Sequence, residues 1–475
     1  MNADSSSALG LERTLLQRVL DENAQLDPSG MARISRDLAA GDAAGDHREQ
    51  ERFLHDRYID LRHVLRSRAD RSVVDRFASP PSGRDADPGI DYGYERSAPS
   101  AVLDGRLVDG EPDITGWTAS GVVCSSGMAA LTVALHVAAY EFRSVHGRLP
   151  KVALLGDYFE TTMLIELVST SFASWSRCRS VAELVATRAD VVVLEPVRYD
   201  WDLHTVDFIE LSTAWSAQGA PRTVIVDPSL TPGVWPKQQL LTTLTGTDTA
   251  TVIEARSALK LDQLGLELAN AGAVVVHRND ALTAAVSDPE TLRNARAVLG
   301  AALPPRSAIA LDNSFFLDPD WRRTHVALVA RNNEAFARAL SVDRGLFETV
   351  AHPANRPRGA DTRDGSVRVA PFTVLRLEDD DLLGYRLLLG VIRTEADRRG
   401  VDLQFGASFG FRSHRHETIV PRKRDLRCLL KVALGARGGP AMDGVIELFR
   451  DLHALGSMDA VRRHFRGVRP IELAL

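Results

Sequence analysis

Apolar and polar residues follow three different patterns along the chain. In the first, leucine and valine recur at helical spacing between Leu11 and Leu20, and the same spacing returns between Phe53 and Leu65. The stretch 79–99, which is rich in proline and glycine, predicts a loop or an arm. Residues 1–100 are therefore expected to form a helical N-terminal extension that ends in an arm.

The second pattern alternates valine-rich runs with helical stretches. The runs are bounded by Gly, Asp or Pro, which is typical of strands buried on both faces of a mostly parallel sheet. Helical periodicity appears at 129–142 and 162–172. Residues 101–330 are therefore expected to form a large α/β domain whose sheet is flanked by helices. The expected strands are 152–155, 191–194, 223–226, 251–253 and 273–276.

The third pattern mixes helices and strands over a shorter length. It predicts a smaller C-terminal α+β domain at residues 331–475. Its expected helices are 327–340, 380–398 and 442–455, and its expected strands are 367–375, 403–405 and 429–434.

Composition narrows the class of protein. The 475 residues are 44% hydrophobic and 25% charged, and no apolar run is long enough to predict a membrane span. The net charge of −6 gives no electrostatic case for nucleic acid, and the N-terminus lacks a signal-peptide pattern. Three widely spaced cysteines exclude a disulfide framework and the usual zinc spacings. We expect a cytoplasmic enzyme without a metal site.

The first candidate for chemistry is the turn Ser126-Gly127-Met128, which precedes the apolar stretch 129–142. Small residues allow a close backbone approach, and a helix N-terminus presents unpaired N–H groups at the positive end of its dipole. These features suit a phosphate cradle. Taken alone, serine at this place is more often an ordinary helix cap.

An acid and a lysine follow two of the expected strands. Asp227 comes directly after 223–226, where ligands of α/β sheets bind, so it would hold a cationic ring nitrogen or a metal, or cap the next turn. Lys260 lies beyond 251–253 among small and apolar residues, where loss of hydration makes an amine nucleophilic. Taken alone, such a lysine is more often a solvated surface charge.

The three motifs occur in one order within one expected domain, and together they resemble fold type I pyridoxal-phosphate enzymes. They are most similar to the Cys/Met-metabolism family, which includes cystathionine γ-synthase, cystathionine γ-lyase and methionine γ-lyase. The family motifs read Ser126-Gly127-Met128, Val226-Asp227-Pro228-Ser229 and Ser257-Ala258-Leu259-Lys260 in this chain. The resemblance extends over residues 92–435.

This resemblance implies pyridoxal 5'-phosphate as the cofactor and a small-molecule amino-acid substrate. Lys260 would form the Schiff base and then act as the base, and Asp227 would pair with the ring nitrogen. The cofactor phosphate would be held by residues of two turns, Ser126, Gly127, Met128 and Ser257.

Two more segments extend the resemblance. Tyr94 and Arg96 match a family segment that reaches the cofactor phosphate of the partner subunit, which implies a homodimer or a homotetramer. The family also places an aromatic residue on the cofactor ring. Tyr158 is assigned this role because its hydroxyl can transfer a proton, and Phe159 is the alternative.

The chain departs from the family at several places. The family asparagine near the cofactor ring oxygen is missing from 195–199, where Arg198 or Tyr199 would donate instead. Leu259 replaces a phosphate-binding threonine. Lys431 stands where the family has the arginine that clamps the substrate carboxylate, and lysine lacks the bidentate fork. Arg412 is therefore expected to share or take over this role of Lys431, and Ser408, just before it in the sequence, is also expected to bind substrate.

The expected reaction is γ-elimination or γ-replacement on an L-amino acid with a thio, acyl or halo substituent at Cγ. A β-lyase or an aminotransferase on the same fold is the alternative, followed by a cofactor-binding homologue without catalysis. The segment 406–410 also matches the Gly-x-Ser-x-Gly elbow of hydrolases, but no apolar helix follows it. His414, His416 and Glu417 are weighed as metal ligands, but two histidines two apart in an expected loop are interpreted as polar surface.

Overall fold

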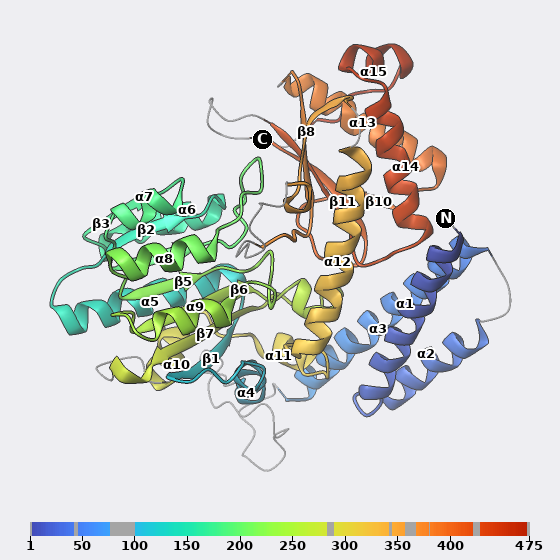
Figure 1. The fold of residues 1–475 in the computed structure, drawn as a ribbon. Coiled ribbons are helices and arrows are strands. Elements are labelled where there is room, and N and C mark those ends of the chain that lie inside the picture. Colours follow the sequence, from blue (N-terminus) through green and yellow to red (C-terminus); the bar gives the residue numbers. More distant parts are fainter. Residues whose placement is uncertain are drawn as a thin grey trace.

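The structure is a computed structural model of the chain (Figure 1). The expected arm at 79–99, with Tyr94 and Arg96, lies outside the residues that the structure describes. The described residues are 2–41, 46–76, 100–282, 289–341, 344–356, 367–379, 381–420 and 428–472.

A seven-stranded sheet forms the centre of the large α/β part. Its order is β1-β7-β6-β5-β4-β2-β3; β7 runs antiparallel to both neighbours, and the other adjacent pairs are parallel. The expected mostly parallel sheet is confirmed. Its strands are β1 Trp117–Cys124, β2 Lys151–Leu155, β3 Ser174–Arg177, β4 Val191–Leu194, β5 Thr223–Val226, β6 Thr251–Ser257 and β7 Gly272–Asn279.

Helices cover both faces of this sheet because successive strand residues point to opposite sides. On β5, Val224 belongs to the apolar core that includes residues of α7, α8, α9 and α12, whereas Ile225 belongs to the core that includes residues of α5, α6 and α10. This two-sided burial explains the valine-rich strands. The helices of this part are α4 Ala101–Asp109, α5 Gly127–His146, α6 Phe159–Leu167, α7 Val181–Ala186, α8 Phe208–Gln218, α9 Lys237–Leu244, α10 Pro289–Val298, α11 Pro305–Leu311 and α12 Pro319–Leu340.

A second, five-stranded sheet forms the C-terminal part, in the order β10-β11-β12-β9-β8. Its core contains apolar residues of α12, α13 and α14, and Figure 1 shows α12 running beside this sheet. The elements are β8 Phe347–Ala351, β9 Thr373–Leu377, α13 Leu382–Arg399, β10 Leu403–Phe405, β11 His414–Ile419, β12 Leu429–Ala433, α14 Pro440–Ala454 and α15 Met458–His464.

Strand β11 corrects the interpretation of its histidines. The segment was expected to be a loop, but it pairs with β10 and β12, so His414 and His416 are buried instead of lying on a polar surface. The same pairing excludes a hydrolase elbow at 406–410, because that motif needs a helix after the serine and here a strand follows.

Three N-terminal helices form a separate packed layer: α1 Asn2–Glu22, α2 Pro28–Ala40 and α3 His47–Arg76. Their leucines share a core with α11, and Glu51 of α3 accepts a hydrogen bond from the backbone N–H of Ala441 at 2.7 Å. The helices therefore contact both the large and the small part (Figure 1). Within the described residues, no helix has the length and apolar character needed to cross a bilayer.

Candidate active site

The predicted turn before α5 forms an anion-binding geometry. Ser126 is extended and caps the helix, because its Oγ accepts a hydrogen bond from the Ala129 N–H at 3.0 Å. The amides of Gly127 and Met128 come first in this 20-residue helix, where backbone donors have no partner within the helix. A Cβ on Gly127 would lie 2.9 Å from Ser257 Cα, so only glycine permits this contact with the end of β6.

We expect Gly127→Ala to destabilise the protein by about 1–3 kcal/mol, because the added methyl group meets Ser257 backbone that cannot rotate away. Gly105→Ala is the matched control: a Cβ there meets no atom within 4 Å, and alanine suits a helix interior. Urea unfolding of both variants checks the difference. Equal stabilities would show that the Gly127 contact does not constrain the fold.

Asp227 lies directly after β5 and is linked through Ser229 to the end of β6. Its Oδ1 accepts from the Ser229 N–H at 2.9 Å, and Ser229 Oγ accepts from the Ser257 N–H at 2.9 Å. Burial raises the pKa of the Asp227 carboxyl, while Ser229 and Lys260 act in the opposite direction. The carboxylate is thus held in a poorly hydrated place where a cationic partner would lower its pKa.

Lys260 lies just beyond β6, and its Nζ is 4.4 Å from the centre of the Phe409 ring. The Nζ atom makes no hydrogen bond or ion pair with another residue of the described ranges, whereas the backbone carbonyl of Lys260 accepts from the Gly265 N–H at 3.0 Å. Burial and then the positive charge of Lys431 lower the pKa of Lys260 to about 8, against the opposing effect of Asp227. Near neutral pH this amine is therefore much more readily available as a nucleophile than an ordinary lysine.

Labelling of Lys260 by an amine-specific reagent is expected to rise with a midpoint near pH 8, below the ordinary lysine value of 10.5. Lys431→Met should move this midpoint to higher pH, because removing a neighbouring positive charge favours the protonated amine. Peptide mass spectrometry quantifies the labelling, with exposed Lys151 as internal reference. A wild-type midpoint near 10.5 would contradict the assigned environment.

Four aromatic side chains that begin with Phe409 lie in a row, which we call the aromatic wall: Phe409, Phe372, Tyr199 and Tyr158. Ring centres lie 5.6 Å apart for Phe409 and Phe372, 5.2 Å for Phe372 and Tyr199, and 5.5 Å for Tyr199 and Tyr158. The Tyr158 hydroxyl donates to Glu160 at 2.7 Å, and burial raises the pKa of this tyrosine. Tyr158 therefore lies in the wall, whereas the alternative, Phe159, is 57% exposed.

Lys431 reaches this wall but already has partners. It is 2% exposed, forms an ion pair with Glu417 on the neighbouring strand, and donates to the Tyr199 hydroxyl at 3.0 Å. Glu417 and Lys431 are directly opposite each other in the β11–β12 register. Burial lowers the pKa of Lys431, and Glu417 counteracts this effect.

Arg412 contacts the N-terminal helices. Its guanidinium pairs with Glu12 of α1 and stacks on Tyr58 of α3, 3.3 Å from the ring centre. The side chain is therefore held by the N-terminal helices in this structure, and its expected role in binding substrate stays a prediction. Ser408 is half-buried in the loop before Phe409, with a strained φ of 82°.

Arg198 and Tyr199, the two residues expected to replace the missing family asparagine, have different surroundings. Arg198 pairs with Asp157 and donates to the Arg179 carbonyl at 2.7 Å, whereas Tyr199 belongs to the aromatic wall. Of the two, the structure brings only Tyr199 beside Tyr158.

Sequence reasoning assigned no role in this site to four of its residues: Glu160, Glu195, Phe372 and Glu417, of which Glu417 was weighed only as a metal ligand. Glu195 accepts from the backbone N–H groups of Asp157 and Tyr158, at 2.9 and 3.1 Å, and burial raises its pKa to about 8. Its place directly after β4, next to the strand that carries Asp227, is a signal that would have found it. Phe372 has no such local signal.

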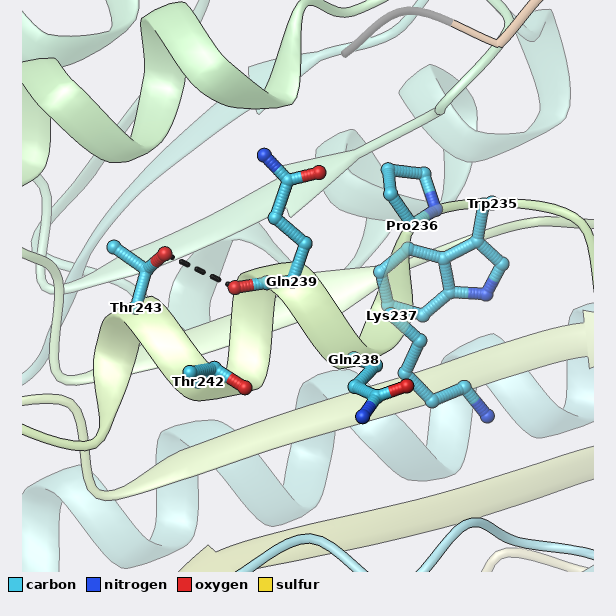
Figure 2. Close-up of a pocket in the computed structure, with 7 residues that line it drawn as sticks. All are labelled: Trp235, Pro236, Lys237, Gln238, Gln239, Thr242 and Thr243. Carbon is cyan, nitrogen blue, oxygen red and sulfur yellow. Dashed lines mark hydrogen bonds between the residues drawn. The ribbon is translucent and has the colours of Figure 1, made fainter. Parts of the chain in front are cut away.

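A hollow on α9 is separate from this site. Figure 2 shows that it is lined by one stretch, from Trp235 to Thr243, and that the Thr243 hydroxyl is bonded to the Gln239 carbonyl of the same helix. None of the residues around Lys260 lines it. We therefore place the candidate site at Lys260, where the turn before α5, Asp227 and the aromatic wall meet.

A mostly parallel sheet with one antiparallel strand, a helix N-terminus beside it and a lysine after β6 define a fold that occurs in known enzymes. The chain is similar to cystathionine γ-synthase from Xanthomonas oryzae pv. oryzae, solved in complex with cystathionine. The TM-score is 0.56 at 18% identity, over 84% of this chain and 98% of that chain.

Two other solved structures show the same likeness. For cystathionine γ-lyase from yeast the TM-score is 0.53 at 15% identity, over 79% of this chain and 90% of that one. For a methionine γ-lyase from Micromonospora echinospora it is 0.52 at 18% identity, over 79% and 96%. No protein-family model and no curated protein matches the sequence. The chain thus has the fold of these enzymes, as the motifs predicted.

Proposed function

We propose that the chain is a pyridoxal 5'-phosphate-dependent enzyme of the Cys/Met-metabolism type. One observation carries the proposal: Lys260, whose pKa is lowered to about 8, lies with Asp227 and the N-terminus of α5 at one end of the sheet. The residues fit the cofactor in their charge and in the turn that would meet its phosphate. Gly127 leaves room for a close backbone approach, and the buried Asp227 carboxylate suits a protonated ring nitrogen.

The cofactor, when bound, stabilises negative charge that develops at the substrate Cα. Lys260 would hold its aldehyde carbon and then, released by the substrate amine, take the Cα proton. A Cβ proton must be lost next, because only electrons at Cβ can expel a substituent at Cγ. Asp227 would keep the ring nitrogen protonated, and Tyr158 would stack on the ring and pass a proton to the leaving group. The phosphate would be held by Ser126, Gly127, Met128 and Ser257.

The proposed reaction is γ-elimination or γ-replacement on a γ-substituted L-amino acid. The likeness to γ-synthases and γ-lyases supports this choice, because these structures align with nearly their full length. We also propose a homodimer or a homotetramer in which Tyr94 and Arg96 of one subunit reach the cofactor phosphate of its partner.

The absorption spectrum tests the proposed function. Wild-type protein mixed with pyridoxal phosphate should develop a visible-edge band that survives gel filtration, and borohydride should fix the cofactor on the Lys260 peptide. Lys260→Ala should lose this covalent label. Wild-type protein that stays colourless with added cofactor would refute the proposal.

A further inference from the structure

We infer that Glu417 makes this site select an amino acid whose carboxyl group is carried as an amide rather than as a free carboxylate. The inference rests on the proposed function and names its substrate class. The feature behind it is the pair of Glu417 and Lys431, which lies across β11 and β12 at the aromatic wall.

The pair lies close to the reacting lysine. Lys431 Nζ is 5.5 Å from the centre of the Phe372 ring and 5.6 Å from that of Tyr199, and Phe372 packs on Phe409, which contacts Lys260. Both charges of the pair also act on the Lys260 amine. A substrate bound at Lys260 would therefore present its nearby groups to Lys431 and Glu417.

The positive charge of Lys431 is already compensated within the protein. Its ammonium is buried, its position is set by the Tyr199 hydroxyl at 3.0 Å, and the Glu417 carboxylate neutralises it. A free substrate carboxylate would place two anions on one buried ammonium, and like charges in a poorly hydrated site repel strongly. This arrangement is unfavourable for an anionic carboxylate.

The same pair suits a carboxamide. The Lys431 ammonium has three N–H donors. One contacts Glu417 and one donates to Tyr199, so the third remains for a carbonyl oxygen. Glu417, whose side chain is 18% exposed, has acceptor capacity left for an amide N–H. Donor and acceptor side by side match the C=O and N–H of an amide, which brings no charge of its own.

The test compares L-methionine and L-methioninamide by the spectral change that each causes in cofactor-loaded protein. Wild-type protein should bind the amide at least tenfold more tightly than the free acid. Glu417→Gln should shift the ratio of the two dissociation constants at least tenfold toward the acid, because it releases the charge of Lys431. Glu334→Gln, which removes a carboxylate from the ion pair with Arg338 on α12, should leave the ratio unchanged.

The outcomes separate the two claims. Wild-type protein that shows the Lys260-dependent band but binds methionine as tightly as its amide overturns the inference alone. A ratio that Glu417→Gln leaves unchanged also overturns it. Wild-type protein without the band refutes the proposed function, and the inference falls with it. The wild-type comparison holds even if the Glu417 variant does not fold.

Discussion

Replacing Lys260 with alanine is expected to lower turnover of a γ-substituted amino acid by about a thousandfold or more, since a positioned proton-transfer group contributes 10²–10⁴-fold. The loss should appear in kcat, because the alanine variant keeps Asp227 and the turn before α5. Those groups do not depend on the lysine: Ser126 caps its own helix, and Asp227 is held by Ser229. Cofactor binding should therefore persist without a covalent bond.

The loss of kcat is measured by stopping the reaction at set times and quantifying the keto-acid and unsaturated products. Lys151→Ala is the control, because Lys151 is exposed on β2 and should leave turnover unchanged. Added methylamine, a small replacement base, should restore part of the Lys260→Ala activity. An alanine variant with wild-type kcat would remove Lys260 from the chemistry.

Replacing Arg256 with methionine is expected to cost about 3–5 kcal/mol of unfolding free energy, because it breaks a buried ion pair and leaves carboxylates undercompensated. Arg256 is 1% exposed and bonds Glu254 at 2.7 Å and Asp262 at 2.9 Å. Burial alone would raise the pKa of Glu254, but the adjacent cations, Lys237 first, hold it well below its usual value. Methionine fills similar space without this charge.

The matched control is Arg323→Met on α12. Arg323 pairs with Asp320 while both side chains are about 70% exposed, and such surface pairs contribute little. Its expected cost is below about 1 kcal/mol. Urea unfolding at pH 7 compares the two variants, and a cost for Arg256→Met as small as that of Arg323→Met would contradict the role of the buried network.

Much of the fold could be predicted because its signals are local. The valine-rich strands around Val224 and Ile225 follow from burial on both faces, and this pattern needs no knowledge of the partners. Strand β11 was missed because its polar residues, His414 and His416 among them, are not typical of a buried strand. Their burial depends on neighbouring strands, which local sequence does not reveal.

The candidate site also has a part that the sequence predicted and a part that only the tertiary structure decided. Asp227 and Lys260 each follow an expected strand, and strands that run parallel end at one edge of a sheet, so the sequence by itself predicted that these two groups meet. Strand β1, which ends just before Ser126, was not among the expected strands, and only the family resemblance linked Ser126 to the other two. Tertiary structure alone decided the partners of the charged side chains. Arg412 pairs with Glu12 from the far end of the chain, and Lys431 is opposite Glu417 through strand register. A buried charge takes the partner that packing brings near, and packing depends on the whole chain.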